Sequence, residues 1–270
     1  MTTRWQDAPQ ADFAVLGKPI AHSLSPMMHG AAFQVLGLEY RYVALEVEPE
    51  ELAPALDFLR DKGYEGVNLT VPLKEAVMPL LDNVEDFALA CGAANCIRLD
   101  DYTGINTDGP GFIETLHDLE IDERKDVLLI GSGGSAASIG LALVDIGFNL
   151  RIWSRDPNNA ARLAARLGDQ ASVSVELDPK GVGMLVNATP ASLFGESLPV
   201  LWGRCDPDAV AYDLAYGMQL KFLDDAAAHT RMCVDGLMML MEQGALAFEW
   251  WLGLPAPRDA MLSCLLEAKL

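Results

Sequence analysis

The sequence has no hydrophobic run long enough to form a transmembrane helix, and it does not begin like a secreted protein. Residues 1–12 are mostly polar and lack the basic and apolar regions that together make a signal peptide. We therefore expect a soluble, cytoplasmic protein that has no membrane partner.

Basic residues are also scarce. The chain has 19 Lys and Arg against 39 Asp and Glu, which gives a formal net charge of -20 and a pI of about 4.4. This charge argues against binding to nucleic acid or to an anionic membrane, because both are themselves negatively charged. An anionic substrate would have to be held by a few local cations or hydroxyl groups, because the negative charge of the whole protein repels it.

Patterns typical of disulfides and metal sites are missing too. The five cysteines are odd in number and include no C-x-x-C pair, so we expect buried, reduced thiols. The four histidines include no H-E-x-x-H or similar spacing, so we expect no structural metal.

What the sequence does have is enough apolar residues for a sizeable core. Hydrophobic residues make up 51% of its 270 positions, which suits one large or two modest domains. Apolar strands alternate with helical patterns, and this alternation predicts an α/β fold with parallel or mixed sheets. Two lobes with a cleft between them, where small ligands usually bind, are the natural interpretation.

The expected elements follow from hydrophobic spacing and from Gly and Pro boundaries. Ser25 before Pro26 predicts a helix start with the serine as N-cap, and Gly37 is the expected C-cap. We predict strands at 13–17, 40–47, 66–71, 96–99, 127–130, 150–153, 173–175, 184–186 and 210–212. We predict helices at 25–36, 49–62, 82–90, 106–117, 134–146 and 157–167, and a helical last fifty residues at 219–229, 236–252 and 258–270.

The most informative stretch is V-L-L-I-G-S-G-G-S-A-A at residues 127–137. Four apolar residues predict a buried parallel strand, and Gly131, Gly133 and Ala136 match the dinucleotide-binding pattern G-x-G-x-x-G/A. Gly131 permits the tight turn, Gly133 lets the backbone approach a pyrophosphate, and Ala136 allows close helix–strand packing. The N–H groups at the helix start then face the phosphates. An ordinary glycine-rich turn is the structural alternative.

Several polar residues stand in apolar or loop settings elsewhere in the chain. Ser23 and Ser25 flank a strand-to-helix turn that could bind a carboxylate, but the residues alone favour a turn residue at 23 and an N-cap at 25. Asn68 and Thr70 fall on one face of a predicted strand, and Lys74 follows its end, where α/β sites gather. A lysine on a surface helix explains Lys74 equally well. Asn95, Asp108 and Gln243 complete the set, with Asp108 equally explained as an N-cap.

Together these stretches resemble the shikimate dehydrogenase family over nearly the whole chain. The matching patterns are G-x-P-I-x-H-S-x-S-P-x-x-H at 17–29, N-x-T-x-P-x-K at 68–74, G-A-V-N-T (here G-A-A-N-C) at 92–96, N-T-D-G-x-G at 106–111, the glycine turn, and G-L-x-M-L-x-x-Q at 236–243. Six patterns in the right order are far more specific than any one of them. The resemblance favours functional roles for Ser23, Ser25, Lys74 and Asp108.

The resemblance implies an enzyme that interconverts 3-dehydroshikimate and shikimate with NADPH, in the pathway to chorismate and the aromatic amino acids. It implies that Ser23 and Ser25, with help from Tyr216, hold the substrate carboxylate. Asn68, Thr70, Asn95 and Gln243 would bind the ring hydroxyls and line the pocket. Lys74 would be the acid/base at the C3 oxygen, oriented by Asp108, because a proton donor stabilises charge that develops there. A carboxylate neighbour favours the ammonium form of Lys74, whereas burial opposes it.

The implied architecture has an N-terminal α/β substrate-binding domain and a Rossmann-type dinucleotide-binding domain, with C-terminal helices returning to the first lobe. The expected boundaries are 1–108 plus 238–270 for the first domain and 109–237 for the second. The cofactor-binding residues would be Gly131, Ser132, Gly133, Gly134, Ser135, Ala136, Ser154, Arg155, Asp156, Asn187, Ala188, Thr189 and Gly236. We expect a monomer or homodimer with a small-molecule substrate.

Arg155 favours NADP, because an arginine after the second nucleotide strand accommodates a 2′-phosphate. The family pattern N-R-T reads Ser154-Arg155-Asp156 here, and Asp156 could repel that phosphate or bind a ribose, so NAD stays an alternative. Ser192 and Leu193 replace the family's G-M, and residues 216–221 lack the proline and threonine of Y-x-P-L-x-T. These departures could change cofactor position or rate.

Two other functions stay open at this point. One is a relative that acts on quinate or aminoshikimate, and the two serines at 23 and 25 favour shikimate over quinate by resemblance. The other is a non-catalytic nucleotide-binding regulatory protein. The lysine–aspartate pair argues against it, because a regulatory homologue has no need of that pair.

Overall fold

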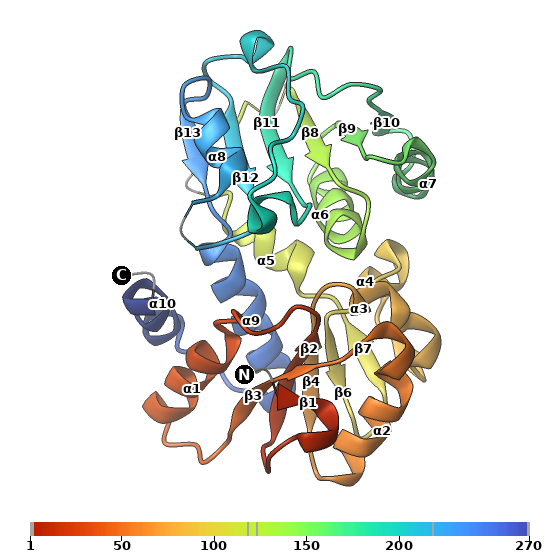
Figure 1. Cartoon of the computed structure of the whole chain (residues 1–270), viewed down its shortest axis with the longest axis vertical. Helices are drawn as coiled ribbons and strands as arrows, with labels where there is room; N and C mark the ends of the chain where they lie inside the picture. The colour runs from red at the N-terminus through yellow and green to blue at the C-terminus, as the bar shows by residue number, and fades with distance from the viewer. Residues whose placement is uncertain (1–2, 118, 123, 218, 269–270) are drawn as a thin grey trace. The chain divides into compact units, whose positions relative to one another are not determined.

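The computed structural model describes residues 3–117, 119–122, 124–217 and 219–268, and the chain divides into two compact units. Unit 1 comprises Met1–Gly111 and Leu240–Leu270, and unit 2 comprises Phe112–Met239. Each unit contains one sheet with helices around it (Figure 1). The α/β class expected from the sequence is therefore confirmed.

The sheet of unit 1 is mixed. Its strands run in the order β1-β3-β2-β4-β6-β7-β5. They are β1 (Thr3–Arg4), β2 (Phe13–Gly17), β3 (Tyr42–Glu46), β4 (Gly66–Leu69), β5 (Asn83–Val84), β6 (Cys96–Arg98) and β7 (Thr103–Ile105). The pairs β1–β3, β3–β2 and β2–β4 are parallel, whereas β6 is antiparallel to both β4 and β7.

This pairing brings several strand ends to one edge of the sheet. Asn68 at the carboxyl end of β4 lies opposite Cys96 at the amino end of β6. Cys96 in turn lies opposite Ile105 at the carboxyl end of β7. The residues that follow β2, β4 and β7, and the residue that precedes β6, therefore emerge at the same edge.

The helices of unit 1 cover this sheet and its ends. They are η1 (Trp5–Asp7), α1 (Ser25–Val35), η2 (Pro49–Glu51), α2 (Leu52–Asp61), α3 (Leu73–Ala76), η3 (Met78–Leu80), α4 (Asp86–Cys91) and α10 (Arg258–Ala268). The helices α5 (Asp108–Glu114) and α9 (Leu237–Leu252) each contain a boundary between the units. Helix α10 packs against α1, so helices from the two separate stretches of unit 1 lie side by side.

The sheet of unit 2 is fully parallel, in the order β10-β9-β8-β11-β12-β13. Its strands are β8 (Asp126–Ile130), β9 (Leu150–Trp153), β10 (Ala171–Val173), β11 (Val182–Asn187), β12 (Val210–Asp213) and β13 (Met232–Val234). Numbered by their sequence within the unit, the order is 3-2-1-4-5-6, which is the dinucleotide-binding arrangement. The order reverses between β8 and β11, and the Rossmann-type expectation for this part of the chain is confirmed.

The helices of unit 2 connect these strands. They are α6 (Gly134–Asp145), α7 (Pro157–Leu167), η4 (Ala191–Phe194), η5 (Trp202–Arg204) and α8 (Lys221–Ala226). The four apolar residues at 127–130 are fully buried, as expected for a central parallel strand. Gly140 lies where α6 crosses this sheet, and an added Cβ would approach Leu167 Cδ1 at 2.7 Å.

Several local predictions were wrong. The predicted helix at 82–90 contains strand β5 and is helical only from Asp86, and the strand predicted at 173–175 lies two residues earlier, as β10. Helix α1 begins at Ser25 itself, so Leu24 occupies the N-cap position and no side chain caps the helix there. The chain between the predicted helices at 219–229 and 236–252 forms β13, which pairs with β12 despite its short length. Cys91 and Cys96 are buried free thiols, but Cys205 and Cys264 are partly exposed and Cys233 is exposed. The glycine expected to end this helix is confirmed, because Gly37 is left-handed at φ +67° directly after Leu36 and donates its backbone N–H to the Gln34 carbonyl at 3.2 Å. The last two positions of the predicted helix 258–270 lie outside the described residues.

In the part of the chain that the structure describes, none of the helices combines the length and apolar character needed to cross a membrane.

Candidate active site

The first predicted site residues follow β2. Ser25 is 6% exposed and is the first residue of α1, and its backbone N–H donates to Ser23 Oγ at 3.3 Å. Ser23 is half-buried in the turn before that helix. The two hydroxyls therefore flank the N-terminus of an eleven-residue helix, where backbone N–H groups favour a bound anion.

The next residues belong to β4 and to the turn that follows it. The Asn68 side chain donates from Nδ2 to the carbonyl of Asn95 at 3.0 Å and accepts the Tyr42 hydroxyl at Oδ1, at 2.8 Å. Because a carbonyl can only accept, the first contact fixes which end of the Asn68 amide faces Asn95. Tyr42 was missed in the sequence, where it looks like an ordinary aromatic strand residue. Thr70 lies just past the end of the strand and is half-buried.

Lys74 and Asp108 form an ion pair, although 34 positions separate them in the sequence. Lys74 Nζ lies 2.6 Å from Asp108 Oδ2, and the two side chains are only 11% and 5% exposed. Lys74 is on α3 just after β4, and Asp108 begins α5 just after β7, so the shared sheet edge brings them together. So little solvent reaches the pair that its attraction is weakly screened.

Asp108 does not cap its own helix. The Asn106 Oδ1 atom accepts the Asp108 backbone N–H at 2.9 Å, which leaves the Asp108 carboxylate for other partners. No role was predicted for Asn106, although an Asn two residues before a helix start is a recognisable capping signal. The N-cap explanation for the Asp108 side chain is therefore wrong.

Asn95 links the remaining polar side chains of this edge. Its Oδ1 accepts the Thr107 backbone N–H at 2.7 Å, so its Nδ2 faces Asp108 Oδ1 at 2.9 Å and Gln243 Oε1 at 3.3 Å. Both oxygens of Asp108 are thus held, one by Asn95 and the other by Lys74. We call Asn95, Asp108 and Lys74 the lysine cluster.

His29, the last residue of the first matching pattern, lies beside this region as a packing residue. Its ring stacks on Tyr42 with centroids 4.4 Å apart and planes 5° apart, and the side chain is fully buried. Burial lowers the pKa of His29 to about 3, because desolvation disfavours the imidazolium form. Neither ring nitrogen has a hydrogen-bond partner among the described residues. His29 is therefore an uncharged aromatic ring near neutral pH.

The glycine turn of unit 2 has the shape that a dinucleotide needs. Gly131 has φ +124°, and a Cβ there would lie 3.2 Å from the Ala188 backbone, so only glycine fits. Gly133 is the N-cap of the twelve-residue α6, and an added Cβ would meet nothing within 4 Å. The backbone at Gly133 therefore borders open space at a helix N-terminus, which is where phosphate binds. Ala136 is fully buried, as its proposed packing role requires.

Two residues of opposite charge follow β9, and their contacts differ. Arg155 is exposed and forms no ion pair within the described chain, whereas Asp156 Oδ1 accepts the Asn158 backbone N–H at 2.9 Å and caps α7. Ser154 lies beside the glycine turn, because its Oγ is 2.9 Å from Ser132 Oγ. The residues present thus fit a phosphorylated ribose better than a bare one, since the acid is already in use.

The other predicted cofactor residues lie after β11 and before α9. Asn187 Oδ1 accepts both the backbone N–H and the hydroxyl of Thr189, at 3.0 and 2.7 Å. A Cβ on Gly236 would lie 2.1 Å from the Leu214 carbonyl oxygen, so Gly236 allows two backbone segments to touch. Tyr216 is half-buried in the loop after β12, and Met218 in the altered stretch lies outside the described residues.

The structure thus joins some predicted residues and leaves others separate. Asn68, Asn95, Lys74, Asp108 and Gln243 form one hydrogen-bonded set. Ser23, Ser25 and Thr70 emerge at the same sheet edge, without a recorded hydrogen bond to that set within the described ranges. Tyr216 and the cofactor residues belong to unit 2.

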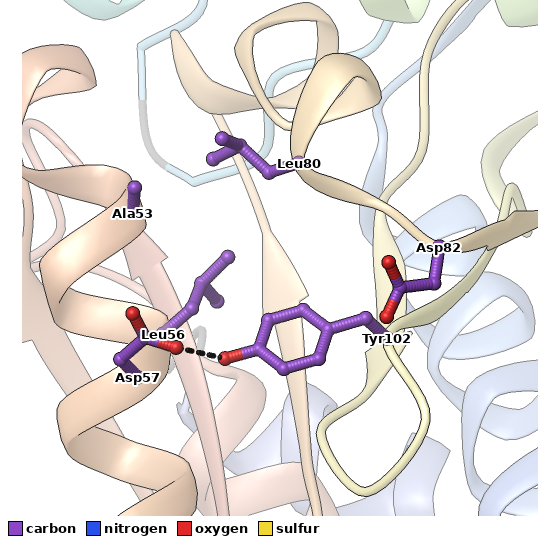
Figure 2. Close-up of a pocket in the computed structure, with 6 residues that line it drawn as sticks. All are labelled: Ala53, Leu56, Asp57, Leu80, Asp82 and Tyr102. Atoms are coloured by element: carbon purple, nitrogen blue, oxygen red, sulfur yellow. Dashed lines mark hydrogen bonds between the residues drawn. The ribbon is translucent and has the colours of Figure 1, made fainter.

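A surface pocket of unit 1 lies apart from these residues. Figure 2 shows its lining of Ala53, Leu56, Asp57, Leu80, Asp82 and Tyr102, with a volume of about 210 Å³. Tyr102 donates its hydroxyl to Asp57 at 2.7 Å, so these two polar groups of the pocket already bind each other. None of the predicted site residues lines this pocket, and it gives no indication of a ligand.

Comparison with known proteins gives the family. Residues 15–97 match the family model described as the shikimate dehydrogenase substrate binding domain, and residues 236–263 match the shikimate 5'-dehydrogenase C-terminal domain. A shikimate dehydrogenase (NADP(+)) of Desulfitobacterium hafniense is 36% identical over 270 residues, covering 95% of this chain and 97% of the relative. The chain belongs to the shikimate dehydrogenase family.

Two further family members support the membership from sequence and from structure. A shikimate dehydrogenase (NADP(+)) of Thermus thermophilus is 40% identical over 246 residues, covering 90% of this chain and 92% of the relative. The crystal structure of a shikimate 5-dehydrogenase from the same organism, in complex with NADP(H) and shikimate, superposes with a TM-score of 0.85 at 38% identity. That match covers 95% of this chain and 98% of the other, so the likeness to the shikimate dehydrogenase family extends over both units.

Proposed function

We propose that this protein is an NADP-dependent shikimate dehydrogenase, which reversibly reduces 3-dehydroshikimate to shikimate on the route to chorismate. The observation that carries the proposal is the buried Lys74–Asp108 ion pair, at 2.6 Å, within the sequence patterns of the family. A proton donor held by a carboxylate at a polar sheet edge suits the reduction of a ketone to an alcohol.

Unit 1 is the proposed substrate-binding unit. The hydroxyls of Ser23 and Ser25, at the N-terminus of α1, suit the substrate carboxylate, because helix N–H groups add positive potential there. Tyr216 of unit 2 is the further carboxylate ligand that the family pattern implies. Asn68, Thr70, Asn95 and Gln243 present amide and hydroxyl groups that suit the ring hydroxyls.

The proposed chemistry places one proton at one oxygen. NADPH, when bound, supplies the hydride that reduces the ketone carbon. Lys74 Nζ donates a proton to the oxygen on which negative charge develops, and it takes the proton back in the reverse direction. Asp108 holds Lys74 through Oδ2, while Asn95 fixes Oδ1, so the ammonium group is positioned before substrate arrives.

Unit 2 is the proposed NADP-binding unit. The open backbone at Gly133 and the first turn of α6 would hold the pyrophosphate. Arg155 would hold the 2′-phosphate, since its guanidinium is exposed and Asp156 is engaged as a helix cap. Ser132, Ser135, Ser154, Asn187, Ala188, Thr189 and Gly236 complete the proposed cofactor set.

The test is a direct assay of the purified protein. NADPH formation is followed by absorbance with shikimate as substrate, with NAD⁺ replacing NADP⁺ and with quinate replacing shikimate. We expect turnover of shikimate with a higher kcat/KM for NADP⁺ than for NAD⁺, and lower kcat/KM for quinate. Nucleotide binding without turnover of either substrate would instead indicate a regulatory protein, and a preference for quinate would reassign the substrate.

A further inference from the structure

Unit 2 contains a buried polar cluster in which Asp213 and Ser192 have no role in the proposed mechanism. Asp213 at the carboxyl end of β12 is fully buried, and Asn187 and Ser192 beside it are 0% and 4% exposed. Asn187 and Asp213 lie directly opposite each other on β11 and β12. We call Asn187, Asp213 and Ser192 the serine cluster.

Asp213 takes all its hydrogen bonds from uncharged donors. Its Oδ2 accepts the Ser192 hydroxyl at 2.5 Å and Asn187 Nδ2 at 3.1 Å, and its Oδ1 accepts the Ala215 backbone N–H at 3.0 Å. Burial raises the pKa of the Asp213 carboxyl, because the anion has lost its water. Each of these donors therefore matters, since a buried carboxylate is costly without hydrogen bonds.

Ser192 has a second contact that gives it a bridging position. While its hydroxyl donates to Asp213, its Oγ also accepts the backbone N–H of Phe222, at 3.3 Å, in the first turn of α8. One side chain thus connects η4, the end of β12 and the start of α8. The segment between Asp213 and Phe222 is held at both of its ends by this one hydroxyl group.

Both contacts depend on the hydroxyl group of Ser192. The family pattern has a glycine at this position, and a glycine could make neither contact. The chain also lacks the family's proline and threonine in the segment that follows Asp213. The Ser192 hydroxyl therefore connects the loop after β11 to both ends of the segment that follows β12.

We propose that Ser192 is a positioning residue that, through Asp213, fixes the loops after β11 and β12 for the nicotinamide half of NADP. The inference rests on the proposed function. Strands β8–β10 form one mononucleotide half of unit 2, with Arg155 at the end of β9, and strands β11–β13 form the other. Because the phosphate-reading residue belongs to the first half, the second half receives the nicotinamide. In this proposal Ser192 acts through Asp213, which Asn187 also contacts.

The experiment measures binding of two probes, NADP⁺ and adenosine 2′,5′-bisphosphate, by titration calorimetry. The second probe contains the adenosine half alone. For Ser192→Ala we expect the Kd of NADP⁺ to rise about five- to tenfold while the Kd of adenosine 2′,5′-bisphosphate stays unchanged. The KM for shikimate should change less than the KM for NADP⁺. Ser172→Ala, which removes a hydroxyl from β10 in the first half, should leave both values unchanged.

Two further variants test whether Ser192 acts through Asp213. Ser192→Thr keeps a hydroxyl and should restore NADP⁺ binding to within about twofold of the original protein. Asp213→Asn should weaken NADP⁺ binding selectively, and the double variant should be no worse than the weaker single variant, because both changes break the same contact.

Other outcomes overturn the inference in distinguishable ways. Equal weakening of both probes by Ser192→Ala, additive effects in the double variant, or an unchanged Kd for NADP⁺ would each refute the positioning role while shikimate turnover by the unaltered protein stands. Failure of the unaltered protein to bind NADP⁺ would refute the proposed function, and the inference with it.

Discussion

Each unit buries an asparagine–aspartate pair at one edge of its sheet, but the third partner differs. In the lysine cluster, Asn95 and Lys74 hold the two oxygens of Asp108. In the serine cluster, Asn187 and Ser192 share one oxygen of Asp213, and a backbone N–H takes the other. We propose that the same pair serves two purposes. In this proposal the lysine supplies a proton that can move, whereas the serine supplies a contact that only fixes geometry.

The charge balance of the two clusters differs in the same way. Lys74 neutralises Asp108 with a full positive charge, so removing either partner leaves an uncompensated buried ion. Within the described chain, the hydrogen-bond donors to Asp213 are all neutral. Burial therefore raises the pKa of its carboxyl, because no positive charge compensates the anion for its lost water. We expect the lysine cluster to control the chemical step and the serine cluster to control cofactor binding.

The largest expected effect is on turnover in Lys74→Ala. We expect kcat for shikimate oxidation to fall by about 10²–10⁴-fold, because general acid–base catalysis contributes on this order. Lys62→Ala, which removes a lysine at the end of α2, is the matched control and should keep full activity. An unchanged kcat in Lys74→Ala would remove the lysine from the mechanism and with it the contrast between the clusters.

The comparison itself is tested by making the same change in both units. Asp108→Asn should lower kcat by about 10²-fold, because Lys74 loses the charge that holds its ammonium group. Asp213→Asn should leave kcat within about threefold at saturating NADP⁺ and raise the KM for NADP⁺. If both variants changed the same kinetic constant, the two clusters would not have separate roles.

His29 in unit 1 and Asp213 in unit 2 should change the acid dependence of stability in opposite directions. The pKa of His29 is lowered to about 3 in unit 1, so below its ordinary value of 6.5 the unfolded chain binds a proton that the folded chain does not. The free energy of unfolding should therefore fall by up to about 1.4 kcal/mol per pH unit between pH 6.5 and 3. Asp213 has the opposite sign, because its raised pKa penalises the folded state at neutral pH and acid relieves that penalty.

Denaturant unfolding of His29→Phe at several pH values measures this effect. Phenylalanine keeps an aromatic ring against Tyr42 and removes the titrating group, so the variant should lose stability less steeply below pH 6.5. Amide hydrogen exchange should show the difference in unit 1, with unit 2 as the internal control. An identical pH slope in both proteins would mean that His29 is already protonated, or hydrated, in the folded state.

The smallest expected effects concern cofactor choice. Arg155→Ala should lower the kcat/KM for NADP⁺ by about tenfold and leave that for NAD⁺ within about twofold, because one phosphate contact is lost. Asp156→Thr should shift the ratio toward NADP⁺ by less than about threefold, since threonine also caps helices and the carboxylate already has that role. A large shift would show that Asp156 reaches the ribose site. An unchanged ratio would leave the cap as its only role.

The fold was largely predictable because its signals are local. The helix at 157–167 and the strand at 13–17 were predicted to the residue, since Asp156-Pro157 and Gly17 mark their ends. Strand β13 was missed because three residues carry too little periodicity, and only pairing with β12 defines them. Ser25 was misplaced by one position because a serine before a proline is equally compatible with N-cap and first-turn positions.

The lysine cluster was predictable only as a set of residues and not as a geometry. Motif order identified Lys74, Asn95 and Asp108, but their contacts depend on the antiparallel insertion of β6 between β4 and β7. Ser192 appeared in the sequence only as a departure from a pattern, because its partners at 213 and 222 follow no local spacing. Tyr42 was missed for the same reason, since its hydrogen bond to Asn68 crosses between strands, whereas Asn106 has a local capping bond that its spacing could have indicated.

The order in which the chain passes through the two units has a consequence during synthesis. Unit 2 is one continuous stretch, whereas unit 1 is assembled from two stretches and includes α10, which packs on α1. As the polypeptide leaves the ribosome, the nucleotide-binding half can therefore be complete while the proposed catalytic half still lacks its final layer. A nascent chain arrested before α10 should therefore bind nucleotide but should not yet turn over a substrate.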